Sequence, residues 1–304
     1  MPRHVSSSEL LLRQRLSALT RALPGAQKGD AAMLHHARVA TRRLREALPL
    51  VLPAGSRARK LERKVRRLTR ALGPVRELDV ALLMLDELSA SGDAPPAAIS
   101  RLRQVLRQER QRLQPEMQRE VVRVDVDKLR RRAAAAARKS GTAVAGKGLR
   151  DPARLADARD RAARRAVRLR DAMQNAAGIY LPDRLHAVRI AVKKLRYAME
   201  VTRELSGSRA VTRIQTLKAA QDLLGRMHDL EVLIARVRAV QGSSKAPNLR
   251  LSGDLDQLVR RLETECRLRH GQYMTQRNAL LAICDHAAAM PAGGRHAGAQ
   301  VSAA

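Results

Sequence analysis

The sequence predicts an all-α fold of two four-helix bundles that stem from an internal duplication and are related by a pseudo-two-fold axis. Three observations lead to this prediction. Ala, Leu and Arg, all strong helix formers, dominate the composition, and Trp and Phe are absent. Long segments carry apolar residues at helical spacing, separated by breaks that contain Gly and Pro. The two halves, each of about 150 residues, also repeat each other, which is typical of a duplicated unit.

The first half is expected to contain four helices, at about residues 8–23, 31–52, 57–88 and 97–138. Pro24-Gly25 should end the first of them. Gly73-Pro74 should kink or break the third, because proline removes a backbone donor and clashes with the preceding turn. Pro115 is expected to bend the fourth.

The same series of helices starts again in the second half. They are expected at about 152–177 and 182–205, then between Gly207-Ser208 and a loop at 241–253, and finally at 254–290. Residues 133–148 are low in complexity, and their second part is expected to link the halves. The predicted boundaries are therefore 1–145 for the first bundle and 146–290 for the second. The Gly- and Ala-rich tail at 291–304 should be disordered.

The two halves share a motif of histidine and basic residues. It reads LHHARVATRRLR at 34–45 and LHAVRIAVKKLR at 185–196, and the two copies begin 151 positions apart. A second shared element, LGPVRELDV at 72–80, returns as LGRMHDLEV at 224–232. The basic sets of the motif correspond position by position: His35, Arg38, Arg42, Arg43 and Arg45 match His186, Arg189, Lys193, Lys194 and Arg196.

Helical geometry places the basic residues of each motif on one ridge, at the rim of a bundle. From His35 to Arg45, steps of three, four and three residues keep the side chains within an arc of roughly 80° and extend them over about 15 Å. This spacing suits a linear polyanion better than one compact anion. A single basic face is usually only solvated, but its recurrence favours a binding site. His35 and His186 fit two interpretations, as core histidines that donate to a helix carbonyl or as donors to phosphate oxygens.

The charge balance limits the classes of partner. Lys and Arg number 60 against 29 Asp and Glu, which gives a formal charge of +31 spread along the chain. A polyanion relieves self-repulsion of this size, so nucleic acid, an anionic membrane surface and inorganic phosphate chains are the candidates. No apolar run reaches the ~20 residues of a membrane span, and the first residues lack the apolar core of a signal peptide. We therefore expect a cytoplasmic protein without a membrane span.

Little in the sequence points to catalysis or to a metal. The two cysteines have neither disulfide nor metal-ligand spacing. Glu77 and Asp79, like Asp229 and Glu231 in the second half, stand two positions apart and point to different sides of a helix. We expect one acid of each pair to orient an arginine of the ridge. Phosphate-binding loops, HExxH and GxSxG elements are absent, so no enzyme activity, metal or cofactor is expected.

Over roughly residues 9–288, these motifs resemble the CHAD domain, the conserved histidine α-helical domain. The resemblance implies two pseudo-symmetric bundles and binding of inorganic polyphosphate in a basic central channel, with association with polyphosphate granules. Many relatives carry a triphosphate-tunnel enzyme domain in front, for which this chain has no room, so a stand-alone domain is expected. His35 and His186 would then line opposite walls of one channel. The implied polyphosphate ligands are His35, Arg38, Arg42, Arg43, Arg45 and Arg66 in the first half, and His186, Arg189, Lys193, Lys194, Arg196, Tyr197 and Lys218 in the second.

The residues themselves leave two other functions open. General binding of DNA or RNA through the phosphate backbone is equally supported by the net charge, although almost no aromatic side chains are available for base stacking. A polyphosphate-processing enzyme would need a metal site, and no acidic cluster converges in the sequence. Binding to any polyanion should depend strongly on salt.

Overall fold

The structure is a computed structural model, and it describes residues 7–52, 55–125, 128–131, 135, 152–209, 211–243 and 248–289. The first half contains α1 (Ser7–Gln27), α2 (Ala31–Val51), α3 (Ser56–Ser91) and α4 (Pro96–Val122). The second half contains α6 (Pro152–Ala176), α7 (Pro182–Ser206), α8 (Thr212–Gly242) and α9 (Leu249–Ala288). Every regular element within these ranges is a helix, so the predicted all-α class is confirmed.

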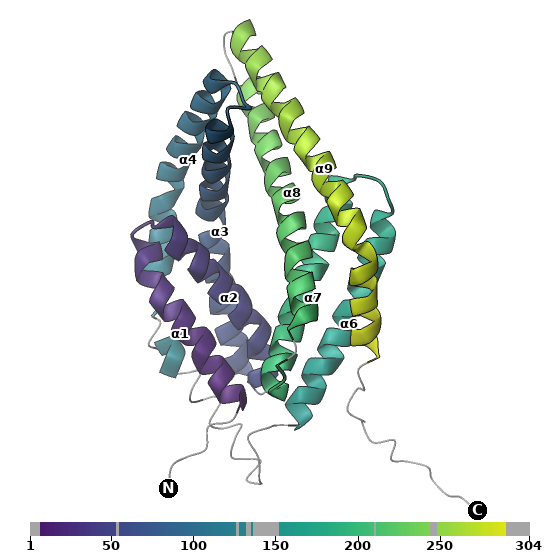
Figure 1. Cartoon of the computed structure of the whole chain (residues 1–304). Helices are drawn as coiled ribbons and strands as arrows, with labels where there is room; N and C mark the ends of the chain where they lie inside the picture. Colours follow the sequence, from purple (N-terminus) through teal and green to yellow (C-terminus); the bar gives the residue numbers. More distant parts are fainter. Residues whose placement is uncertain are drawn as a thin grey trace, which may run out of the picture.

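Each half forms a bundle of four helices (Figure 1). The helices α1 to α4 pack mainly on one another, and α6 to α9 do the same. The bundles meet where α2 contacts α6 and α7, where α1 contacts α7, and where α3 and α4 contact α8 and α9. In Figure 1 the pairs α3–α4 and α8–α9 rise together to the top of the molecule, while α1, α2, α6 and α7 lie lower on either side.

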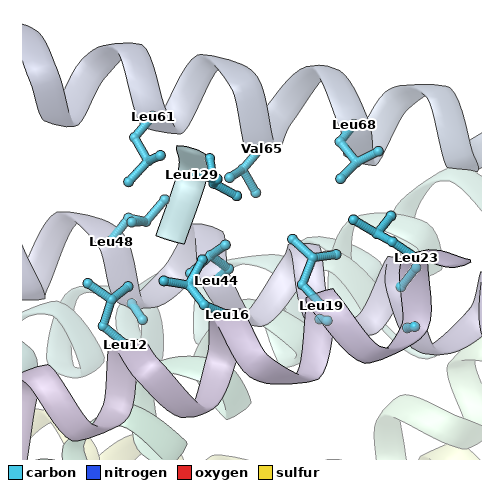
Figure 2. Packing of buried hydrophobic residues seen from close by; sticks show 14 of the residues in the cluster. Leu12, Leu16, Leu19, Leu23, Leu44, Leu48, Leu61, Val65, Leu68 and Leu129 are labelled. Atoms are coloured by element: carbon cyan, nitrogen blue, oxygen red, sulfur yellow. The ribbon is translucent and has the colours of Figure 1, made fainter. Parts of the chain in front are cut away.

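Buried apolar side chains form three clusters, of which the first and the third contain residues of both halves. The first fills the first bundle, where Leu16, Leu44 and Leu68 from three helices meet (Figure 2). The second lies among α6, α7, the first half of α8 and the last part of α9. The third is built by the remaining parts of α3, α4, α8 and α9, with Leu78 and Leu230 fully buried. Residues far apart in the sequence thereby hold the bundles together around a common centre.

Two predicted helix breaks are wrong. The helix α1 continues past Pro24, and α3 is one helix through Gly73 and Pro74. An interior proline costs roughly 3 kcal/mol. Leu72 and Val75 beside it are almost fully buried, however, and burial of each such side chain contributes about 1.5–3 kcal/mol. Gly73 also lacks the Cβ that would clash with the proline ring.

Two helix boundaries also differ from the prediction. The helix α4 ends at Val122 and not near residue 138, and α9 begins at Leu249 instead of residue 254. The earlier start of α9 follows from Asn248, whose side-chain oxygen accepts a hydrogen bond of 3.0 Å from the backbone N–H of Leu251. The predicted boundary at 145/146 and the tail at 291–304 lie outside the described residues. No described helix is long and apolar enough to cross a membrane.

Candidate functional site

The motif helices α2 and α7 line a common cavity between the bundles. This central cavity has a volume of about 560 Å³ and is also lined by α3 and α8. Six of the predicted polyphosphate ligands line it: His35, Arg38, Arg42, His186, Arg189 and Lys193. Cations and histidines from both halves, widely separated in the sequence, thus meet in one place.

The apolar faces of α2 and α7 determine where the basic faces point. The helix α2 begins after Asp30, whose carboxylate accepts a hydrogen bond from the Met33 N–H at 2.8 Å. Leu34 and Leu44 are fully buried in the first cluster, and Val188 of α7 is fully buried in the second. Because neighbouring positions on a helix differ by about 100°, His35 and Arg189, which follow Leu34 and Val188, turn toward the cavity.

Two glycines allow the motif arginines to lie close to the adjacent helices. A Cβ at Gly73 of α3 would lie 3.0 Å from the Arg38 guanidinium, and a Cβ at Gly225 of α8 would lie 3.9 Å from Arg189 Nε. The two glycines belong to the repeated LG elements. Arg38 also donates a long hydrogen bond of 3.4 Å to the Thr69 carbonyl oxygen. The first arginine of each motif therefore packs against the same kind of helix backbone in both halves.

Burial and mutual repulsion lower the pKa values of several cavity cations. Burial, followed by repulsion from Arg42, lowers the pKa of Arg38 to about 10 and that of Lys193 to about 7. Burial also lowers the pKa of Arg189, and the carboxylate of Asp229 opposes this shift. An anion in the cavity would reverse these effects, because an opposite charge favours the protonated form.

The histidines of the cavity have lowered pKa values as well. His186 Nδ1 and His228 Nδ1 lie 3.1 Å apart, so one ring donates a hydrogen bond and the other accepts it. Burial and the nearby Arg189 lower the pKa of His228 to about 4 and also lower that of His186. Burial and then Arg76 lower the pKa of His35. At neutral pH the three rings are therefore uncharged hydrogen-bonding groups.

Several predicted residues lie outside the lining of the cavity. Arg196 is buried, donates to Glu200 and stacks on Tyr197 at 4.3 Å from the ring centre. Arg43 pairs with the same Glu200 at 3.5 Å. This network ties α2 to α7. Lys194 is exposed, and its carbonyl oxygen accepts a hydrogen bond from another arginine.

The remaining predicted cations lie on the surface. Lys218 pairs with Asp222 at 3.2 Å, and both side chains are exposed. Arg45 and Arg66 are exposed neighbours: burial of part of the Arg45 side chain, and next the charge of Arg66, lower the pKa of Arg45. Arg42, which lines the cavity, also acts on Arg45. A row of positive charge therefore leads from the cavity to the surface of α3.

The four predicted acids have different surroundings. Asp79 pairs with Arg110 at 2.6 Å, and Glu231 accepts a hydrogen bond from the Tyr180 hydroxyl. Glu77 and Asp229 line the cavity, where they act electrostatically on Arg38 and Arg189 respectively. In each half, one acid of the pair is thus next to a motif arginine. The described residues contain no group of three or more His, Cys, Asp or Glu side chains that could hold a metal ion.

Three basic or histidine side chains of the cavity were not among the predicted ligands: Arg76, Arg226 and His228. All three come from the repeated LG elements, at 72–80 and 224–232. That signal was present in the sequence, but Arg76 and His228 occupy equivalent positions with different side chains. Selecting ligands by matching side chains in the two copies therefore overlooked residues that the packing of α3 and α8 brings to the site.

Fold and cavity together define an all-α protein with a cation-lined centre between two helical bundles. The chain belongs to the CHAD domain family, whose pattern it matches over residues 10–238. The crystal structure of the CHAD domain from the plant Ricinus communis has a similar fold, with a TM-score of 0.58, 22% identity and coverage of 96% of this chain and 95% of that one. PptA from Streptomyces chartreusis is similar with a TM-score of 0.53, 17% identity and coverage of 91% and 96%. No curated protein matches the chain.

Proposed function

We propose that this protein binds inorganic polyphosphate in its central cavity without chemically changing it. The observation that carries the proposal is that both copies of the motif contribute a histidine and two cations to one cavity. Membership of the CHAD family supports the same ligand. Association with polyphosphate granules in the cytoplasm would follow from such binding and is part of the proposal.

The arrangement of the cations favours a chain of phosphates over one compact anion. The cavity cations come from four helices, and along α2 they continue from Arg38 through Arg42 toward Arg45. A linear polyanion can contact successive cations along such a path. It would also offset the repulsion that lowers the pKa of Lys193, and this gain should contribute to affinity.

A double substitution of Arg42→Gln and Lys193→Gln tests the proposal. Neither side chain forms an ion pair with an acid in the described part of the chain, so their removal leaves no carboxylate without its partner. Hydrogen bonds to charged groups contribute about 1.5–3 kcal/mol each, so we expect a loss of affinity of roughly 100-fold or more. The measurement is a polyphosphate titration by calorimetry, with circular dichroism to verify helicity. Undiminished binding by a folded double variant would refute the proposal.

A charge-matched control separates local contacts from net charge. Arg250 and Arg260 are exposed on α9 and do not line the central cavity, and their replacement by Gln also removes two cationic side chains. This control should retain wild-type affinity. Duplex DNA added as a competitor tests the alternative of general nucleic-acid binding: displacement of polyphosphate at equal phosphate concentration would favour that alternative. Incubation with Mg²⁺ should leave the polyphosphate chain length unchanged, and any change would contradict the non-catalytic role.

A further inference from the structure

The first part of α3 presents an exposed, strongly basic surface outside the central cavity. Its exposed cations are Arg59, Lys60, Arg63, Lys64, Arg66, Arg67 and Arg70. Within the described residues only Arg67 has an acidic partner, Glu120, at 2.6 Å. Like charges that are three or four positions apart on a helix repel each other. This segment therefore lacks the ion pairs that neutralise many other arginines of the molecule.

Four of these cations form a straight row. Arg59, Arg63, Arg66 and Arg70 follow one another at steps of four, three and four residues. On a helix these steps keep the side chains within an arc of roughly 60° and spread them over about 16 Å. The apolar side chains on the opposite face, such as Leu61 and Leu68, pack into the first cluster (Figure 2). The row consequently faces away from the core.

This row is continuous with the central cavity. The helices α2 and α3 pack side by side, and Arg45 of α2 lies among Arg42, Arg66 and Arg70 as judged by their electrostatic effect on its guanidinium. Arg42 lines the cavity. The side chains that act on Arg45 thus include Arg42 of the cavity and Arg66 and Arg70 of α3, with the carboxylate of Glu46 beside them.

The corresponding positions of α8 do not form such a row. The helices α3 and α8 are equivalent, since each packs its LG glycine against the first arginine of a motif. The positions on the second half that correspond to the row, 152 residues later, are Val211, Gln215, Lys218 and Asp222. Lys218 and Asp222 form an ion pair with each other. The basic row of α3 therefore has no equivalent at the corresponding positions of α8.

We propose that the row of Arg59, Arg63, Arg66 and Arg70 binds the part of a long polyphosphate chain that extends out of the central cavity, over α3 and not over α8. This inference rests on the proposed function and names its ligand class, a polyphosphate longer than the cavity. The charge of the row is complementary to phosphate, and a linear polyanion fits its length. Bound phosphates would relieve the repulsion among cations that have no acidic partners.

The test compares a short and a long ligand. Arg59→Gln and Arg63→Gln are combined, because both residues lie outside the cavity and Gln has a helix propensity close to that of Arg. We expect affinity for long-chain polyphosphate at low salt to fall by roughly threefold to tenfold, the range for two exposed charge contacts. The salt dependence of binding should become weaker, because fewer counterions are released. Affinity for tripolyphosphate, which is short enough to stay in the cavity, should be unchanged.

The other possible results of this test distinguish a failure of the inference from a failure of the proposed function. Wild-type affinity of the Arg59/Arg63 variant for long chains would overturn the inference while leaving the proposed function intact. An equal loss in the control with Arg250→Gln and Arg260→Gln would also overturn it, because the effect would then be one of net charge. A loss of duplex DNA binding without a loss of polyphosphate binding would assign the row to nucleic acid instead. Failure of the wild-type protein to bind either polyphosphate would refute the proposed function itself.

Discussion

The lowered pKa of Lys193 predicts that polyphosphate binding weakens as pH rises above 7. Lys193 lies half-buried in the central cavity, and burial together with Arg42 and Arg189 lowers its pKa to about 7, from an ordinary value of 10.5. A bound polyanion restores the higher pKa, because it stabilises the charged ammonium. Binding above pH 7 therefore requires uptake of a proton by Lys193, and alkaline conditions oppose it.

The size of the effect follows from the two protonation states. With a pKa of about 7 in the free protein, half of the Lys193 side chains are charged at pH 7 and roughly one in eleven at pH 8. Affinity should therefore fall about fivefold over this interval and approach a tenfold loss per further pH unit. The histidines of the cavity have pKa values lowered from 6.5, so in the ligand-free protein they are largely neutral over this interval.

The assay is a titration with long-chain polyphosphate between pH 7 and 9, on the wild-type protein and on Lys193→Arg. Arginine remains charged at these pH values, so the variant should bind with an affinity that is almost independent of pH. The same ligand is used for both proteins, which cancels any titration of the polyphosphate. An equal pH dependence in the wild type and in Lys193→Arg would refute the reasoning.

The stability of the ligand-free protein should depend on pH in the opposite direction from polyphosphate affinity. Since the pKa of Lys193 is lower in the folded than in the unfolded chain, the unfolded chain binds more protons between pH 7 and 10.5, and stability rises with pH in that window. The contribution of Lys193 to the free energy of unfolding should increase by up to about 2 kcal/mol from pH 7 to 9, and by less where solvent screens the half-buried side chain. Urea unfolding of the wild type against Lys193→Gln measures this difference.

Two further predictions concern stability. Gly73→Ala should lower the free energy of unfolding by about 1 kcal/mol and weaken polyphosphate binding, because its Cβ would crowd both the Arg38 guanidinium and the following proline. Gly225→Ala has room for a Cβ and should instead raise the free energy of unfolding by about 0.5–1 kcal/mol without changing affinity. Identical shifts in melting temperature for the two variants would contradict this prediction. Glu200→Ala should destabilise by roughly 3–5 kcal/mol in urea, because the buried Arg196 loses its carboxylate, and a loss below about 1 kcal/mol would mean that solvent reaches Arg196.

The sequence alone determined the helices and the location of the motif. Helical spacing of leucine and alanine predicted α2 and α7 almost to the residue, because an amphipathic face is a local property of the chain. The recurrence of His35 and its cations at His186 also identified the helices that line the cavity. The predicted break at Gly73-Pro74 was wrong, because burial of the neighbouring side chains keeps α3 continuous although proline disfavours a helix.

Only the tertiary structure decided which cations of each motif line the cavity and which lie elsewhere. Arg42 lines it, whereas the adjacent Arg43 pairs with Glu200 of the other half, and Arg196 is buried in the same network. Neighbouring positions on a helix point about 100° apart, so the contact between α2 and α7 assigns one residue to the ligand site and the next to the interface. A repeated motif defines the candidates, but the partner of Arg43 comes from a helix more than 100 residues away in the sequence.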